Sequence, residues 1–403
     1  MLIKNVRIIT CTENAGKSGA IAGAKENTGP GEIEKGWILS EDGIILELGD
    51  MDSLPSYSGE SIDASGCTVI PGLIDAHCHI GLQGEDLTTN GQSLSVDGDL
   101  VTPQLRAIDA IDPLDPHFAK ALAAGITTVV TGPSSSNLIG GRFVALHTSG
   151  RRVDKMVVQD NVSIKFTLGD HPKQVLEEGY KTPMNRMAEA ALLREYLFKA
   201  NEYALKKDAA VRDDDAEDPL FDIKLEALMP VVKKEMKVYF HAGSLNDVYT
   251  AIRIATEFDL DYTLLCTDDI NLEAESLASE RITVITCPKP INGYTPESES
   301  IKFEGLDRLA KAGVRMAIST GHPSVPISYL PYCAAQGIKC GMDKDYALRS
   351  VTIHAAQSAG IEERVGSIEP GKRCDLVVFE SNPFDMDSRI RMVIIDGEIV
   401  FCP

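Results

Sequence analysis

One stretch constrains the fold of this chain more than any other: residues 69–81 read Val-Ile-Pro-Gly-Leu-Ile-Asp-Ala-His-Cys-His-Ile-Gly. Apolar and β-branched residues on both sides of Pro71-Gly72 predict a strand that is covered on both faces, as in a parallel sheet. Because side chains alternate along a strand, His77 and His79 are expected on one face and Cys78 on the other. Two adjacent neutral imidazoles form half of a metal site, although two hydrogen-bonded core histidines would give the same pattern.

The length and charge of the chain exclude some classes of protein. With 403 residues, the chain is too long for one small domain and fits a barrel-sized domain with a smaller one. Hydrophobic residues make up 43% and charged residues 25%, as in ordinary globular proteins. The formal net charge of -21 would repel phosphate backbones, so nucleic-acid binding is not expected.

Cysteine usage and the N-terminus both indicate a cytoplasmic protein. The nine cysteines are odd in number and contain no C-x-x-C pair, which favours free thiols in a reducing compartment. Residues 1–10 carry charges within their apolar stretch and no cleavage site, so they are interpreted as a strand. Because no stretch is apolar enough to span a bilayer, no membrane association is expected.

The two ends of the chain share a β character. Short apolar runs separated by turn residues such as Asp42-Gly43 predict strands within residues 1–66, and the same pattern recurs within residues 365–403. Neither end contains enough strands for a stable sheet of its own. The two ends are therefore predicted to form one composite β-sandwich domain.

Residues 67–364 alternate predicted strands with predicted helices, which favours a parallel sheet with helices outside it. Helices are expected over residues 117–124, 184–206, 245–257, 271–279, 304–312 and 326–360. The pattern predicts a (β/α)8 TIM-type barrel, whose chemistry would lie at the carboxyl ends of the strands. The polar residues at those ends are His77, His79, His241, Cys266 and Thr320.

Two motifs resemble the amidohydrolase superfamily, and within it the imidazolonepropionase-like and Xaa-Pro-dipeptidase-like members. Residues 71–79 are similar to the first-strand motif of the family. Residues 367–378, Ser-Ile-Glu-Pro-Gly-Lys-Arg-Cys-Asp-Leu-Val-Val, are similar to its C-terminal signature, where the chain leaves the barrel. The resemblance implies hydrolysis of C–N bonds by water that is activated by one or two divalent metal ions, with zinc as the expected metal.

The resemblance also implies a ligand set. His77 and His79 match the first-strand ligands, His241 matches the fifth-strand ligand, and Lys165 matches a fourth-strand lysine that some members carboxylate. An apolar strand favours the neutral amine of Lys165, which takes up CO2 to form a carbamate with two metal-binding oxygens. Alternatively, Lys165 extends to a carboxylate at the strand end and His241 is a core histidine.

The chain departs from the family pattern at two strand ends. Cys266 stands where the family has a histidine after strand six, and a thiolate there could also bind zinc. Gly321, in Ser-Thr-Gly-His-Pro, stands where the family has the aspartate that accepts the proton of the attacking water. Loss of a general base costs about 10²–10⁴-fold in rate.

Substitutes for that base lie nearby in the sequence. His322 and Asp268 are the predicted catalytic residues, while Asp269, Asp170 and His171 are further candidates, and each could equally be a solvated loop residue. Asp75 is expected to orient a neighbouring group. Core or surface roles are expected for the remaining histidines, which are His117, His147 and His354.

The first hypothesis is therefore a metal-dependent amidohydrolase that acts on an amide, cyclic amide or dipeptide-like small molecule. Loop 287–303, which contains Cys287, is expected to contact the substrate because of its position. The alternative is a catalytically inactive barrel that binds a small molecule or a partner. Neither hypothesis determines the oligomeric state, and both allow a homo-oligomer.

Overall fold

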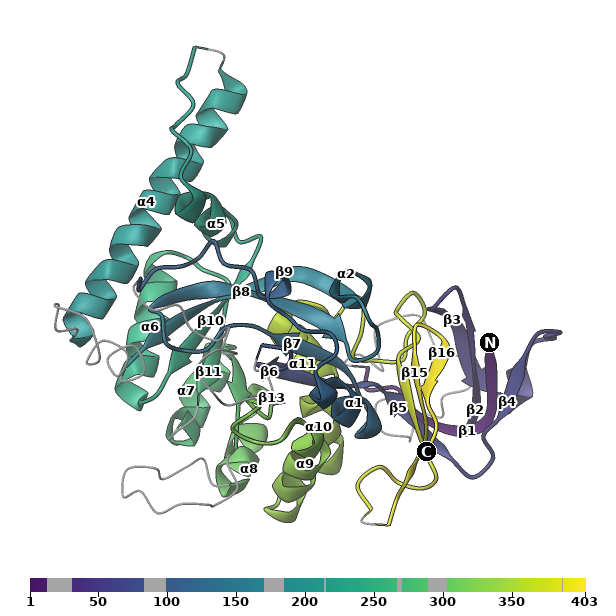
Figure 1. Cartoon of the computed structure of the whole chain (residues 1–403). Coiled ribbons are helices and arrows are strands. Elements are labelled where there is room, and N and C mark those ends of the chain that lie inside the picture. Colours follow the sequence, from purple (N-terminus) through teal and green to yellow (C-terminus); the bar gives the residue numbers. More distant parts are fainter. Residues whose placement is uncertain are drawn as a thin grey trace.

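Two eight-stranded sheets organise the chain. The computed structural model describes residues 1–12, 31–82, 99–169, 185–213, 215–266, 270–288, 303–385 and 387–403. Figure 1 shows one sheet inside a ring of helices and the other at the side of the molecule where both termini lie. We refer to them as the barrel sheet and the terminal sheet.

The barrel sheet contains eight strands that neighbour one another in chain order. They are β6 (Leu73–Cys78), β7 (Ile126–Thr131), β8 (Ile139–His147), β9 (Val157–Leu168), β10 (Lys237–Ala242), β11 (Tyr262–Cys266), β12 (Thr283–Thr286) and β13 (Arg315–Ile318). Two backbone hydrogen bonds connect β6 with the segment after β13: Gly321 N to His77 O at 3.1 Å and His79 N to His322 O at 2.9 Å. The first and last strands therefore meet, as a TIM-like barrel requires.

Helices cover the outside of the barrel sheet (Figure 1). Their apolar faces form the main core with the outward side chains of the strands. They are α1 (Pro116–Ala123), α2 (Val153–Met156), α4 (Arg186–Arg212), α5 (Ile223–Val232), α6 (Leu245–Glu257), α7 (Ala274–Ser279), α8 (Phe303–Ala312), α9 (Leu330–Lys339), α10 (Lys344–Ser350) and α11 (Ile353–Ala359). Short 3-10 turns are η1 (Met51–Ser53), η2 (Ala107–Asp109), η3 (Ile270–Glu273) and η4 (Ile327–Tyr329). None of the described helices is long and apolar enough to cross a membrane.

The barrel differs from the expected fully parallel sheet at β8. This strand runs antiparallel to both β7 and β9. Residues 132–138 are the whole connection from β7 to β8, whereas a parallel crossover needs a dozen or more residues. The carboxyl end of β8 therefore lies at the face of the barrel opposite to the carboxyl ends of its parallel strands.

The terminal sheet combines strands from both ends of the chain in the order β16-β15-β14-β5-β1-β2-β3, with β4 paired to β1. The N-terminal strands are β1 (Leu2–Ile9), β2 (Glu32–Glu41), β3 (Ile44–Asp50), β4 (Ser61–Asp63) and β5 (Thr68–Pro71), and the C-terminal ones are β14 (Leu376–Phe379), β15 (Ile390–Ile395) and β16 (Glu398–Phe401). Antiparallel pairing of β5 with β14 joins the two sets. The chain therefore crosses into the barrel at Gly72, while a sandwich architecture and the domain limits 1–66 with 365–403 stay predictions.

Helix α1 begins next to the carboxyl ends of the barrel strands. Asp115 caps its N-terminus by accepting a hydrogen bond from His117 N at 2.8 Å, and Pro116 occupies the first turn. The other oxygen of Asp115 accepts from Gly81 N at 2.9 Å. The start of α1 is therefore tied to the loop that follows β6.

Candidate active site at the carboxyl ends of the barrel strands

His77 is the buried imidazole at the centre of the candidate site. Its side chain is 5% exposed, and neither Nδ1 nor Nε2 has a hydrogen-bond partner among the described residues. The His79 ring lies edge-on to it, with 5.0 Å between ring centroids. A buried polar group without a partner is costly, so these nitrogens mark a place for one hydrogen-bond acceptor and one group that uses a lone pair, both from outside the described residues.

The tautomer of His79 leaves one nitrogen open. Its Nδ1 lies 2.6 Å from the carbonyl oxygen of Gly132, which can only accept a hydrogen bond. Nδ1 therefore carries the proton, and Nε2 keeps its lone pair. A ligating histidine usually has this kind of partner on its other nitrogen.

Burial keeps both rings neutral. It lowers the pKa of His77 well below the usual value, and Lys165, His79 and His241 act in the same direction. The pKa of His79 falls to about 3 because of burial, followed by the effect of Lys165. At neutral pH both imidazoles therefore offer lone pairs rather than positive charge.

Lys165 lies on β9 with a fully buried side chain. Its ammonium group donates to Pro133 O at 2.9 Å, lies 3.4 Å from Ser135 Oγ and faces the Phe143 ring at 4.9 Å. It forms no ion pair with a carboxylate of the described residues. Burial lowers its pKa to about 7, with Cys287 acting in the opposite direction. A substantial fraction of Lys165 is therefore a neutral amine at pH 7.

His241, near the end of β10, is 5% exposed. In the register of the barrel sheet, His241 pairs with Thr167 and Tyr239 pairs with Lys165. Its electrostatic effect lowers the pKa of His77, in the same direction as those of Lys165 and His79. These three histidines are not as close as a formed metal site, because the single described set of three His, Cys, Asp or Glu donors within 4.8 Å lies elsewhere.

Asp75 connects the first and last strands beneath the histidines. Its fully buried carboxylate accepts hydrogen bonds from the hydroxyl groups of Ser319 and Thr320 and from His77 N. Burial raises the pKa of Asp75 to about 6, and the bonds from Ser319 and Thr320 act in the opposite direction. With these partners, the carboxylate positions the strand ends, as expected of an orienting residue.

His322 lies beside a pair formed by Asp115 and His117. Its side chain is 6% exposed, and its Nδ1 has no hydrogen-bond partner among the described residues. The His117 ring centroid lies 4.5 Å from that of His322, and His117 Nδ1 lies 2.7 Å from Asp115 Oδ1. Burial, followed by His117, lowers the pKa of His322 to about 4. His322 is therefore a neutral base at pH 7.

The sequence predicts only a general core or surface role for His117 and does not predict its place beside His322. The signal in the sequence is Asp115-Pro116-His117, a capping residue two positions before a histidine. An Asp at the N-cap orients its carboxylate toward the first turn of the helix, where the side chain of His117 lies. The predicted residues Asp268, Asp269, Asp170 and His171 lie outside the described residues, as does the side chain of Cys266.

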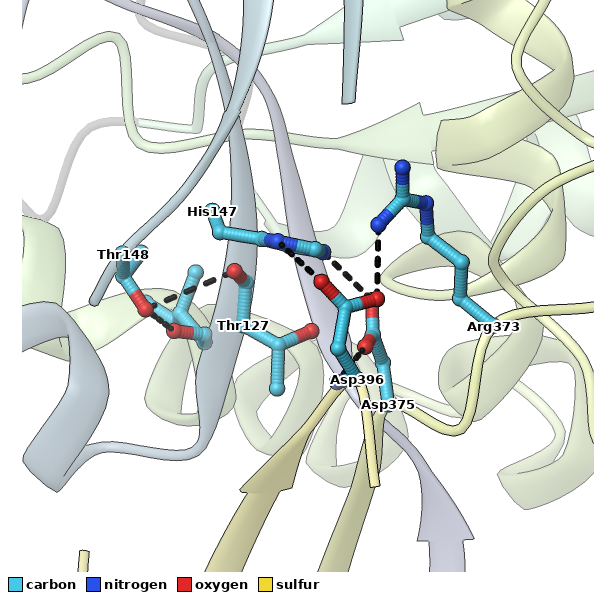
Figure 2. A network of polar contacts seen from close by, with 7 residues as sticks. Thr127, His147, Thr148, Arg373, Asp375 and Asp396 are labelled. Atoms are coloured by element: carbon cyan, nitrogen blue, oxygen red, sulfur yellow. Dashed lines mark hydrogen bonds and ion pairs between the residues drawn. The ribbon is translucent and has the colours of Figure 1, made fainter. Parts of the chain in front are cut away.

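The compact donor set is formed by His147, Asp375 and Asp396, shown in Figure 2. His147 Nε2 lies 2.9 Å from Asp375 and Nδ1 lies 3.5 Å from Asp396. Asp396 also pairs with Arg373 at 2.6 Å, and its amide donates to Asp375 at 2.9 Å. Each carboxylate thus has protein partners, and the cluster joins β8 to the terminal sheet. Because β8 is antiparallel, this junction lies at the barrel face opposite to His77.

The fold and the clustered histidines define a TIM-like α/β barrel with polar side chains at the carboxyl ends of its strands. Residues 165–400, more than half of the chain, match the Amidohydrolase family. The chain therefore belongs to the amidohydrolase family. The segment before residue 165 contains His77, on β6, and His79, directly after this strand.

Individual relatives agree with this assignment. The chain is similar to an amidohydrolase from Thermotoga maritima of known structure, with 30% identity, a TM-score of 0.88 and complete coverage of both chains. It is 26% identical to an imidazolonepropionase of Clostridium tetani, over 100% of this chain and 98% of that relative. It is 25% identical to Amidohydrolase tasK of Hapsidospora irregularis over 91% of this chain, but spans only 40% of that protein. A beta-aspartyl dipeptidase from Fervidobacterium islandicum shares the fold, with a TM-score of 0.59 and 14% identity.

Proposed function

We propose that this protein hydrolyses a C–N bond in an amide, cyclic amide or dipeptide-like small molecule. Membership of the amidohydrolase family and the similarity to imidazolonepropionases support this class of reaction. The observation that carries the proposal is the buried His77 ring, whose two nitrogens have no partner in the described protein. A side chain in this state, next to neutral His79 and Lys165, fits a site built to receive a ligand.

A divalent metal ion, with zinc as the expected metal, is proposed from the chemistry of these donors and not from their spacing, because the described set of three donors within 4.8 Å lies elsewhere. Neutral imidazoles are preferred zinc ligands, and His77, His79, Lys165 and His241 would hold the ion, with Cys266 as a further donor. Lys165 would bind through a carbamate, formed when its amine adds to CO2 and releases a proton. When bound, a divalent ion supplies a Lewis acid that polarises a carbonyl group and makes water nucleophilic at neutral pH.

His322 is the proposed proton acceptor in place of the carboxylate that position 321 lacks. Its neutral ring takes a proton from the attacking water and returns it to the leaving nitrogen. His117 Nδ1 lies 2.7 Å from Asp115 Oδ1, and the His117 ring lies against the ring of His322. A positive charge on His322 would therefore be adjacent to the Asp115–His117 pair. Asp75 holds the strand ends on which both His77 and His322 are mounted.

Metal analysis and activity measurements test the proposal together. Full-length protein purified without chelators should contain about one or two equivalents of a divalent metal and hydrolyse members of a panel of N-acyl amino acids, cyclic amides and dipeptides. His77→Ala should lose both properties. A metal-free protein without turnover would instead favour the catalytically inactive barrel that binds a small molecule.

A further inference from the structure

Helix α4 (Arg186–Arg212) carries two apolar faces. The buried residues of the first face, which packs on the barrel, are Ala190, Leu193, Leu197 and Ala200. The second face is open to solvent, because Met187 is 78%, Phe198 59% and Leu205 70% exposed. Figure 1 shows α4 at the edge of the molecule, with its C-terminal half projecting beyond the barrel. Apolar stripes on helices are normally buried against another element, so the second face requires a partner.

The apolar residues of the second face have a spacing that is symmetric about Phe198. They follow one another at steps of 4, 7, 7 and 4 residues and are Met187, Ala191, Phe198, Leu205 and Ala209. Each step is close to a whole number of helical turns, so these side chains lie along one stripe. At 1.5 Å per residue, the stripe is about 33 Å long.

This symmetry makes the stripe complementary to the same stripe of a second copy. If two antiparallel α4 helices face each other at Phe198, Met187 lies opposite the partner's Ala209 and Leu205 lies opposite the partner's Ala191. Each large side chain then meets a small one, which allows close packing of the two helices. The central ring is already oriented, because Phe198 and Phe258 lie edge to face with 4.9 Å between centroids.

The charges on this face are complementary in the same arrangement. Arg194 lies opposite the partner's Glu202, and a two-fold axis forms this ion pair twice. Within one chain, Arg194 binds Glu257 at 2.8 Å and Glu202 binds Lys206 at 2.7 Å, and all four side chains reach solvent. These contacts can persist, since a guanidinium group has five N–H donors and a carboxylate accepts several hydrogen bonds.

The distribution of charge favours a second copy over a lipid surface. Two chains with a net charge of -21 repel each other overall, but α4 contains six Lys or Arg residues and only four Asp or Glu residues. This helix is therefore a surface at which two copies can approach. Residues 213–218, Asp-Asp-Asp-Ala-Glu-Asp, directly follow α4 and would be repelled by anionic lipids.

We propose that the exposed face of α4 is the contact of a two-fold symmetric homodimer, in which two α4 helices pack antiparallel about Phe198. Two stripes about 33 Å long bury on the order of 1,000 Å² in total, which is near the lower limit of specific interfaces. We therefore expect a dissociation constant in the micromolar range. The dimer does not depend on the proposed catalytic function.

Sedimentation velocity of the full-length protein over a concentration series tests the contact. Leu205→Glu places a charge in the apolar stripe and should raise the dissociation constant more than about tenfold. Leu114→Glu is the matched control, because Leu114 is also 70% exposed but lies outside α4, and this variant should dimerise like the native protein. Both substitutions are at exposed positions, so thermal unfolding should be nearly unchanged in each.

An exchange of charges tests the register. Arg194→Glu and Glu202→Arg each place like charges opposite one another and should separately weaken the dimer by about tenfold or more. An equimolar mixture of the two single variants restores both ion pairs between unlike copies and should dimerise. Loss of the bond from Arg194 to Glu257 within one chain cannot be rescued in this way.

The outcomes are distinct. A native protein that stays monomeric at about 0.1 mM, far above a micromolar dissociation constant, would overturn the proposal. A dimer that persists in Leu205→Glu would overturn it as well, as would one that dissociates only in Leu220→Glu, between α4 and α5, where the side chain is 94% exposed. Failure of the mixture to dimerise would overturn the antiparallel pairing about Phe198.

Discussion

The hydroxyl group of Thr320 donates a hydrogen bond of 2.5 Å to the carboxylate of Asp75. Asp75 lies on β6 and Thr320 follows β13, so this bond joins the first strand of the barrel to the last. His77 and His322 are each two residues from one of these partners. The contact therefore sets the relative position of a candidate ligand and the candidate base.

Thr320→Val is expected to lower the free energy of unfolding by about 1–3 kcal/mol, because it removes one donor from a fully buried carboxylate and the acceptor of the His322 amide without changing the shape of the side chain. Urea unfolding of the metal-free protein measures the change. Thr128→Val is the matched control, since Thr128 is equally buried and its hydroxyl group has no partner among the described residues. The control should be neutral or slightly stabilising, and equal losses in both variants would contradict the role of the bond.

The lowered pKa of Lys165 predicts that the stability of the metal-free protein depends on pH. Its pKa is about 7 in the folded protein and 10.5 in its ordinary state, so between these values the unfolded chain binds a proton that the folded chain does not. The free energy of unfolding therefore rises with pH in this window, by up to about 1.4 kcal/mol per pH unit. Lys165→Met should be more stable than the native protein near pH 7, and the difference should shrink toward pH 10. A difference that is constant with pH would contradict the shifted pKa.

His322→Ala should lower kcat by about 10²–10⁴-fold while the metal content stays unchanged, because it removes the proposed proton acceptor and no proposed ligand. His117→Phe keeps an aromatic ring against His322 and should have a smaller effect. Steady-state kinetics on the best amide substrate, with metal analysis of the same preparations, provide the comparison. Unchanged turnover in His322→Ala would assign the proton transfer to another residue.

Substitution of His147, in the cluster with Asp375 and Asp396, and substitution of His77, in the candidate active site, should have opposite effects on stability and on metal content. His147→Ala breaks a buried pair with Asp375, whose side chains are 4% and 3% exposed, and should cost about 3–5 kcal/mol of stability. Its bound metal, measured per folded molecule, should stay at the native level. His77→Ala should lose the metal and change stability little in metal-free protein. Loss of metal in His147→Ala alone would move the metal site to the junction of Figure 2.

The β6 region shows which structural features the local sequence pattern could predict. Residues 73–79 have strand periodicity, which was enough to predict that the rings of His77 and His79 would be neighbours, and their centroids are 5.0 Å apart. The direction of β8 was not predictable in the same way. Its residues are almost all buried, and a uniformly apolar strand has the same pattern in a parallel or an antiparallel arrangement.

The same distinction between local pattern and tertiary structure applies to the candidate site. The sequence by itself determined the alternating order of strands and helices outside the β7–β8 pair, the motif with two histidines and the family, because these depend on neighbouring residues and their spacing. Only the tertiary structure decided that Asp75 binds Thr320, that His117 lies against His322 and that Cys287 occupies the space beside Gly321. These pairs are far apart in the chain, and closure of the barrel brings their strand ends together. No local periodicity encodes which side chains then meet.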